Sequence, residues 1–375
     1  MELVKQADAL QALGKPVIHL SIGEPDFPMP EPVQSALMKA IADNKTRYTA
    51  ALGLPQLRHA ISDYYQFAFG VQVPARQIVV TSGASAALMY ACLALINQGQ
   101  EVLLADPGYP CNKTFVQMAG GVPKFVQTRE AENFQPDWRT LKSAWTTQTA
   151  GVLLASPNNP TGTQLNPAAM REIVEGVKAN GGFTIVDEIY QSLCYDQAAQ
   201  SVMQVCGIPG EETPIVVINS FSKYFGMTGL RLGWMVVPEG HIRTVERLAQ
   251  NMFICPPHAS QIAALAALDC IDELEANRAT YAENRRLMLE GLPKAGFTRF
   301  APPDGAFYVY ADVSDLTEDS LGFAAEILDG AGVAVTPGLD FDPVRGARTL
   351  RFSYARATAD IVEGLERLRA FMTGR

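Results

Sequence analysis

A run of short, continuously apolar segments, each separated from the next by a helical stretch, most constrains the fold of this chain. These segments read as strands and cover residues 78–81, 101–105, 151–155, 183–186 and 215–218. Strands without polar alternation are buried on both faces, and helical connections between them make their sheet mostly parallel. The alternation predicts an α/β fold with a three-layer αβα domain around a mostly parallel sheet.

Helix signals support this alternation. Residues 84–96 read as a helix that directly follows the first strand. A second helix begins after Asn166, a good N-cap, with Pro167 at its first position and Gly181 past its end. Residues 232–237 read as a further strand.

The length and a change of pattern predict two domains. The chain has 375 residues, beyond the size at which one core keeps growing. After Pro256-Pro257 a long helical stretch at 273–292 precedes three strands and two helices, near 306–311, 319–329, 333–336, 349–354 and 358–371. We predict a large domain at 30–255 and a smaller α/β domain formed by 1–29 and 256–375.

Composition excludes several classes of partner. A net charge of -9 and a pI near 5.1 argue against a nucleic-acid surface. Residues 1–20 lack the apolar core of a signal peptide, and the longest apolar runs are too short to span a bilayer. The six cysteines form no C-x-x-C pair, and the four histidines show no metal-ligand spacing. We expect a soluble cytoplasmic protein without a metal.

The unusual polar residues gather where ligands bind in such folds. Tyr109, Asn159, Asp187, Tyr190 and Lys223 all follow the carboxyl ends of predicted strands. Ligands of open α/β sheets bind in the crevice beyond these ends. The coincidence predicts a small-molecule site at this edge.

Lys223 stands in the most informative segment, which reads S-F-S-K-Y-F-G-M-T-G-L-R-L-G over residues 220–233. A lysine in a loop is usually a solvated surface residue. Here hydroxyls precede the lysine, glycines surround it, and Arg231 follows eight residues later. An amine is needed where a carbonyl cofactor is held covalently, and an arginine fork suits a phosphate.

This segment resembles the cofactor-lysine signature of the class I/II aminotransferases, which are fold-type I enzymes of the aspartate aminotransferase type. The likeness extends from about Ile18 to Arg356, with the landmarks in the family's order. It implies pyridoxal 5'-phosphate as the cofactor, with Lys223 carrying it as a Schiff base. It also implies that Ser220 and Arg231 hold the phosphate.

Two further segments resemble the parts of the family that contact the cofactor ring. By this likeness Asp187, in D-E-I-Y, faces the pyridine nitrogen, and a buried carboxylate there keeps that nitrogen protonated. Tyr190 and Asn159, the latter in N-N-P-T-G, would hydrogen-bond the ring's phenolic oxygen. Taken alone, Asp187 could cap a strand end and the asparagine loop could be only a turn.

Other landmarks of the family concern the phosphate, the ring face and the neighbouring subunit. Ala84 and Ser85 match the helix N-terminus that cradles the phosphate. Tyr109, in D-P-G-Y-P, matches the aromatic residue that stacks on the cofactor, although it could also be a core tyrosine at a surface turn. Tyr48 matches a tyrosine lent to the neighbouring subunit's phosphate, which implies a homodimer.

The substrate end of the site is also implied by the resemblance. Arg351, in L-R-F-S-Y, matches the arginine that grips the substrate α-carboxylate, and the Gly23 backbone and Asn159 lie close to it in the family. An arginine among apolar residues is costly to bury without an anionic partner. The alternative is an edge-strand arginine that reaches solvent.

We therefore expect an aminotransferase that moves the amino group of aspartate, alanine or an aromatic amino acid to a 2-oxo acid such as 2-oxoglutarate. Lys223 would act as general base and Arg351 would orient the substrate. A carbon–sulfur β-lyase on the same fold is the alternative enzyme. A cofactor-sensing regulator domain is disfavoured, because Gly23 comes too early to leave room for a DNA-binding extension.

Overall fold

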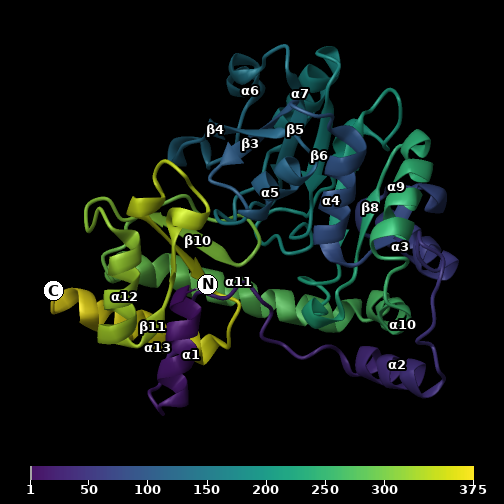
Figure 1. Cartoon of the computed structure of the whole chain (residues 1–375). Coiled ribbons are helices and arrows are strands. Elements are labelled where there is room, and N and C mark those ends of the chain that lie inside the picture. Colours follow the sequence, from purple (N-terminus) through teal and green to yellow (C-terminus); the bar gives the residue numbers. More distant parts are fainter. Residues whose placement is uncertain (1) are drawn as a thin grey trace.

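A seven-stranded sheet forms the main body of the computed structural model, which describes residues 2–375 (Figure 1). The strand order is β2-β8-β7-β6-β5-β3-β4. Only β8 runs antiparallel to its neighbours, so the predicted mostly parallel sheet is confirmed. The strands are β2 (Ile78–Thr81), β3 (Glu101–Asp106), β4 (Val122–Gln127), β5 (Thr149–Ala155), β6 (Phe183–Asp187), β7 (Ile215–Ser220) and β8 (Gly233–Val236).

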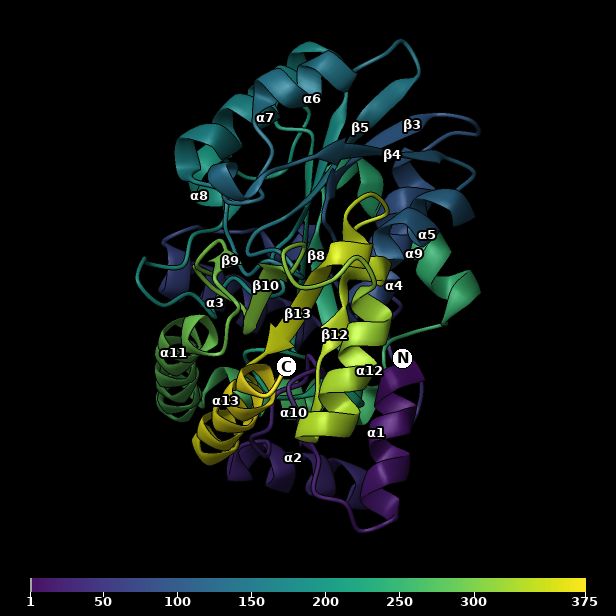
Figure 2. The same cartoon turned by 90° about the vertical axis from the view of Figure 1, so that its left-hand side faces the viewer.

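Helices cover both faces of this sheet (Figure 2). Alternate strand residues enter different cores: Ile78 and Val80 pack in one cluster, and Val79 packs in the other. One face carries α4 (Gly83–Leu95), α5 (Cys111–Met118) and α9 (Glu239–Met252). The other carries α3 (Pro55–Phe69), α6 (Trp138–Ala144), α7 (Pro167–Ala179) and α8 (Val202–Cys206). Burial of both faces explains the unbroken apolar strands.

The predicted helix ends are confirmed at α7. The Asn166 side chain accepts a hydrogen bond from the Ala169 backbone N–H at 2.8 Å, and Pro167 is the first helical residue. Gly181 lies two residues past the last helical position with a φ of +71°. The cap therefore fixes the start of the helix that leads into β6.

A four-stranded antiparallel sheet forms the second layered unit, in the order β12-β13-β10-β9. Its strands are β9 (Arg299–Phe300), β10 (Tyr308–Asp312), β12 (Thr336–Pro337) and β13 (Thr349–Ser353). Around it lie α1 (Glu2–Ala12), α11 (Ile271–Lys294), α12 (Ser320–Ala331) and α13 (Thr358–Thr373), while α2 (Glu31–Ala42) packs on α10 (His258–Leu268) (Figures 1 and 2). Short 3-10 turns are η1 (Ala75–Gln77), η2 (Glu130–Glu132), η3 (Thr228–Leu230), η4 (Gly338–Asp340) and η5 (Gly346–Arg348).

The single strand predicted at 333–336 is wrong in detail. The chain instead forms β11 (Val333–Ala334), which pairs in parallel with β1 (Ile18–His19), and then β12, which joins the antiparallel sheet. The N-terminal segment thus pairs with the C-terminal region, while the exact domain boundaries stay a prediction. None of the helices within residues 2–375 is both long and apolar enough to cross a membrane.

Candidate active site

Two adjoining cavities of about 340 and 240 Å³ lie at the carboxyl edge of the large sheet. They share five lining residues, namely Gly23, Tyr109, Asp187, Ile189 and Lys223. The larger cavity adds Ala84, Ser85, Ser220 and Arg231, and the smaller adds Asn159, Tyr190 and Arg351. The structure therefore brings together every site residue predicted from the sequence except Tyr48.

Lys223 follows β7 and points into the shared part of the cavities. Its Nζ donates a hydrogen bond to the Gly23 carbonyl at 2.6 Å. Burial is the main reason that the Lys223 pKa falls to about 8, and Arg351 and Arg231 lower it further while Glu24 and Asp187 oppose them. A solvated surface lysine is thereby excluded, and a fraction of this amine is neutral near pH 7.

Asp187 is the last residue of β6 and its side chain is buried. Burial raises the pKa of its carboxyl to about 7, although a hydrogen bond from the Ile189 N–H and the Lys223 charge act in the opposite direction. A carboxylate in this position is costly without a cationic partner beside it. The site therefore favours a ligand that brings a protonated nitrogen to Asp187.

One end of the larger cavity is built to hold an anion. Ala84 and Ser85 lie in the first turn of α4 and line this end of the cavity, and the first backbone N–H groups of a helix have no partner within it and suit an anion. A Cβ at Gly83 would come within 2.6 Å of Arg231 Nη2, so glycine leaves room for that guanidinium. Arg231 Nη1 donates to the Thr228 carbonyl at 2.9 Å, which fixes its direction. Ser220 lines the same end.

Arg351 lies at the other end, in the smaller cavity. It is on β13, and only 7% of its surface is exposed. Its Nη1 donates to Asn159 Oδ1 at 2.9 Å and its Nη2 donates to the Ser21 carbonyl at 2.7 Å. An edge-strand arginine that reaches solvent is therefore excluded. No acidic partner neutralises Arg351 in the described chain, so it is suited to a carboxylate from a ligand.

Two aromatic residues hold Arg351: Tyr308, which the sequence places only in the core and pocket wall, and Phe341, for which the sequence indicates no role. The guanidinium carbon lies 4.4 Å from the centre of the Tyr308 ring and 4.7 Å from that of Phe341. The Tyr308 hydroxyl also hydrogen-bonds the Tyr190 hydroxyl at 2.8 Å. A Cβ at Gly23 would overlap this Tyr308 hydroxyl, which explains the glycine. The aromatic run at 307–310 is typical of a core strand and pocket wall, and nothing in that pattern marks Tyr308 as the partner of Arg351.

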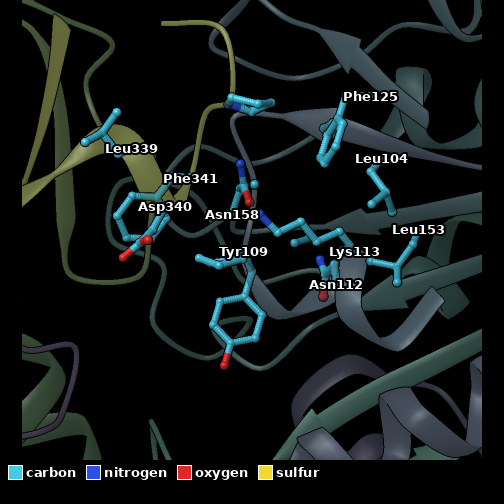
Figure 3. Close-up of a pocket in the computed structure, with 15 residues that line it drawn as sticks. Leu104, Tyr109, Asn112, Lys113, Phe125, Leu153, Asn158, Leu339, Asp340 and Phe341 are labelled. Carbon is cyan, nitrogen blue, oxygen red and sulfur yellow. The ribbon is translucent and has the colours of Figure 1, made fainter. Parts of the chain in front are cut away.

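Tyr109 lies where the large sheet meets the small one. Besides the two cavities, it lines a narrower crevice that Figure 3 shows, with Leu339, Asp340 and Phe341 on one side. The Gly108 N–H donates to the Phe341 carbonyl at 3.0 Å, so the two segments are joined by their backbones. The Tyr109 ring is thus placed at the rim of the cavity that holds Lys223.

Tyr48 does not line either cavity of its own chain. Its side chain is 78% exposed, in the segment between α2 and α3. The role predicted for it at a neighbouring subunit stays a prediction.

The sequence model of the family described as "aminotransferase class I and II" matches residues 15–368 of the chain. The chain belongs to this family. A valine–pyruvate aminotransferase of Mycobacterium tuberculosis is 42% identical over 362 residues, which cover 95% of this chain and 91% of the relative. The solved aspartate aminotransferase of Thermotoga maritima superposes with a TM-score of 0.93 at 32% identity, covering 100% of this chain and 96% of its own. An aminotransferase structure from Mycobacterium tuberculosis gives a TM-score of 0.95 at 40% identity, with 100% and 96% coverage.

Class I and II aminotransferases use pyridoxal 5'-phosphate, and the residues of this chain fit that cofactor. The buried Asp187 needs a protonated nitrogen, the α4 N-terminus with Arg231 suits a phosphate, and Lys223 offers a partly neutral amine. The enzyme class predicted from the sequence is confirmed: the chain is a pyridoxal-phosphate-dependent transaminase.

Proposed function

We propose that this aminotransferase takes the amino group of an L-amino acid with an uncharged side chain, alanine or a larger apolar residue, and transfers it to a 2-oxo acid. One observation carries the proposal. The three cationic side chains that line the cavities would be used by the cofactor and the substrate α-carboxylate, and the lining residue without such a role that carries a charge is the acid Glu24.

Three groups of residues would hold the cofactor. Asp187 would face the ring nitrogen, Tyr190 and Asn159 the ring's phenolic oxygen, and Tyr109 one face of the ring. Ser220, Arg231 and the first turn of α4 at Ala84 and Ser85 would hold the phosphate. When bound, pyridoxal phosphate supplies an electron sink that accepts the electron pair left on the substrate Cα when its proton departs.

Lys223 would hold the cofactor's aldehyde carbon until a substrate amine replaces it. The released Nζ would then take the proton from the substrate Cα as a general base. Its pKa of about 8, lowered chiefly by burial, supports this role, because a lysine at its ordinary pKa would be almost fully protonated near neutral pH. Arg351 would hold the α-carboxylate with its planar fork and so fix the Cα beside Nζ.

The charges in the cavities indicate the class of side chain. Lys223, Arg231 and Arg351 are the lysine and arginine side chains among the described lining residues. They are assigned to the aldehyde, the phosphate and the α-carboxylate. Glu24 adds a negative charge. It accepts a hydrogen bond from Thr228 Oγ1 at 2.5 Å, and its charge raises the Lys223 pKa against the effect of burial. A donor such as aspartate would therefore need a cation from outside this chain.

Relatives span both possibilities, because one is named valine–pyruvate aminotransferase and several are named aspartate aminotransferase. The charge balance supports the first kind of donor for this chain. The same reasoning favours a 2-oxo acid with an uncharged side chain, such as pyruvate, over 2-oxoglutarate as acceptor.

A panel of donors with each acceptor tests the proposal. The purified holoenzyme is assayed with alanine, valine, an aromatic amino acid and aspartate, each with pyruvate or 2-oxoglutarate. We expect larger kcat/KM values for the uncharged donors. Glu24→Gln should raise the aspartate-to-alanine ratio about fivefold, since a partly exposed charge pair is worth about 1 kcal/mol. The control Glu211→Gln changes an exposed acid that precedes β7, at the far edge of the sheet. Aspartate as the preferred donor, or sulfide release without amino transfer, would contradict the proposal.

We also propose that the active unit is a homodimer in which Tyr48 reaches the neighbouring site. Its segment packs beside an exposed apolar surface, since the Thr49 N–H contacts Cys255 Sγ at 3.3 Å and Phe253 and Ile254 are 44% and 49% exposed. Mixing inactive Lys223→Ala subunits with Tyr48→Ala subunits tests it. Mixed dimers would regain one intact site, so activity should exceed that of either variant alone. No gain in dimers shown to have exchanged subunits would refute the proposal.

A further inference from the structure

Asp106, the last residue of β3, has a carboxyl group without a visible partner. The residue is fully buried, and within residues 2–375 neither of its side-chain oxygens has a hydrogen-bond partner. Its backbone carbonyl, by contrast, accepts hydrogen bonds from the Thr128 N–H, the Thr128 hydroxyl and Arg345 Nη2 at 2.9 to 3.0 Å. A buried ionised carboxylate without donors is among the most costly groups in a protein interior.

A second buried acid lies next to Asp106, because the same guanidinium, that of Arg345, donates to the Asp106 backbone carbonyl and to the carboxylate of this acid. This is Asp342, which is 1% exposed and comes from the segment between η4 and η5 of the smaller unit. Its Oδ1 accepts the backbone N–H groups of Val344 at 2.9 Å and Arg345 at 2.6 Å, and its Oδ2 accepts Arg345 Nε at 2.8 Å. Asp342 is therefore the acid that this environment stabilises as an anion.

The number of donors decides which acid keeps a proton. Two carboxylates beside one guanidinium would leave a buried net negative charge, and a single proton removes it. Asp342 accepts hydrogen bonds from three N–H donors, and these favour its charged form. The Asp106 carboxyl accepts none, so nothing there offsets the cost of burying its charge. The proton therefore belongs on Asp106, and Asp342 offers it an acceptor. Burial, followed by the Asp342 charge, raises the Asp106 pKa to about 7, against the lowering effect of Arg345.

We propose that Asp106 is a positioning residue whose protonated carboxyl donates a hydrogen bond to Asp342 and so joins the Tyr109 loop to the segment that holds Arg351. The inference rests on the roles proposed above for Tyr109 and Arg351. Asp106 stands three residues before Tyr109, and Asp342 directly follows Phe341, whose ring stacks on Arg351. The backbone bond from Gly108 to Phe341 runs beside this pair.

The other charged or titratable groups around the pair are few. Arg345 reaches across both segments, since it also donates to the Thr128 carbonyl at 2.6 Å. Tyr310 on β10 senses both acids, but its hydroxyl is bonded to Thr349 Oγ1 at 2.6 Å and its pKa is raised by burial. The neighbouring strand β4 places the uncharged Gln127 opposite Asp106. Among the charged groups nearby, Asp342 therefore favours the proton on Asp106 and Arg345 opposes it.

The pair makes a definite prediction for stability against pH. The folded pKa of Asp106 is raised from 3.8 to about 7, so its proton stabilises the fold fully at low pH. This contribution is lost as pH rises towards 7, because the unfolded chain releases the proton earlier. Asp106→Asn keeps the shape of the side chain and an N–H donor for Asp342, but it cannot ionise. The stability of this variant should therefore not fall in the same way as pH rises towards 7.

The first experiment measures thermal unfolding of cofactor-free protein from pH 5 to pH 8.5. We expect wild type and Asp106→Asn to unfold at similar temperatures at pH 5, and Asp106→Asn to unfold a few degrees higher at pH 8. Asp342→Asn should reduce the pH-dependent loss without removing it, because the negative charge that disfavours ionisation of Asp106 is gone while the burial remains. Asp340→Asn, which removes an exposed acid from the same segment, should follow the wild-type curve. Parallel curves for wild type and both pair variants would overturn the inference.

The second experiment tests the link to the site. In the holoenzyme at pH 6, Asp106→Ala should raise the KM for the amino donor several-fold, with a smaller effect on kcat. Asp106→Asn, which keeps a hydrogen-bond donor for Asp342, should have the wild-type KM. A KM that stays at the wild-type value in Asp106→Ala overturns the positioning role, even where the unfolding curves agree. A preference of the wild-type enzyme for aspartate would instead refute the proposed function, and neither experiment on Asp106 depends on which donor is preferred.

Discussion

Replacing Arg351 by lysine tests how this enzyme holds its substrate. The substitution keeps the positive charge but removes the planar fork that donates to Asn159 and to the Ser21 carbonyl at 2.9 and 2.7 Å. It also removes the guanidinium plane that lies between the Tyr308 and Phe341 rings. A lysine ammonium cannot bond two protein acceptors and both oxygens of a carboxylate in the same geometry.

The expected loss follows from these contacts. A hydrogen bond to a charged group contributes about 1.5–3 kcal/mol, and the variant loses at least one of two to the substrate carboxylate. Lost stacking on the rings adds about 0.5–1 kcal/mol. The sum, about 2–4 kcal/mol, lowers kcat/KM for the amino donor by about 30-fold to 1000-fold.

Steady-state kinetics with alanine and with valine measure this loss. The control is Arg299→Lys, on β9 of the same sheet, where the arginine is paired with Asp312 at 2.7 Å and lies outside the cavities. We expect the control to keep the wild-type kcat/KM and both variants to keep bound cofactor. An Arg351→Lys enzyme within threefold of wild type, in kcat/KM for each donor, would refute the assignment of the carboxylate to Arg351.

Three further predictions concern the neighbours of this residue and the cofactor amine. Tyr308→Phe removes the hydrogen bond to Tyr190 and should lower kcat/KM by about fivefold, as expected for one hydrogen bond of about 1 kcal/mol; steady-state assays check it. Gly23→Ala should reduce activity more strongly, because its Cβ overlaps the Tyr308 hydroxyl, and the double variant with Tyr308→Phe should recover part of the loss. The rate at which apoenzyme takes up pyridoxal phosphate should rise with pH, reach half of its maximum near pH 8 and level off about one pH unit higher, because only neutral Lys223 reacts, and stopped-flow absorbance measures it. A rate still rising steeply at pH 10 would contradict the lowered pKa.

The sequence predicted the parts of this protein that obey local rules. Unbroken apolar segments such as 215–218 become central strands because both faces of the sheet are covered, and Asn166 and Pro167 start α7 as their chemistry requires. The edge strand β4 has mixed burial, so its residues carry neither the apolar run nor a clean alternation. The division of 333–336 into two strands depends on partners distant in sequence, β1 and β13, which no local pattern reveals.

The site was predictable where a residue has few reasons to be present except chemistry. Lys223, Asp187 and Arg351 are polar residues in apolar or glycine-rich surroundings, and the structure places all three at the cavities. The contacts of Tyr308 and Phe341 with Arg351 could not be predicted, because aromatic residues in a strand or beside a turn are usually core or pocket wall. Asp106 was read only as part of a turn, since its partner Asp342 lies 236 positions later in the chain.

Identification of the lysine that bonds the cofactor tests the central claim most directly. The holoenzyme is treated with borohydride, which reduces a carbon–nitrogen double bond to the cofactor to a single bond that does not hydrolyse, and its peptides are mapped by mass spectrometry. We predict that the added cofactor mass lies on the peptide that contains Lys223, and that Lys223→Ala loses both this peptide mass and the visible absorption band. Cofactor found on a different lysine, or an undiminished visible band in Lys223→Ala, would contradict the account.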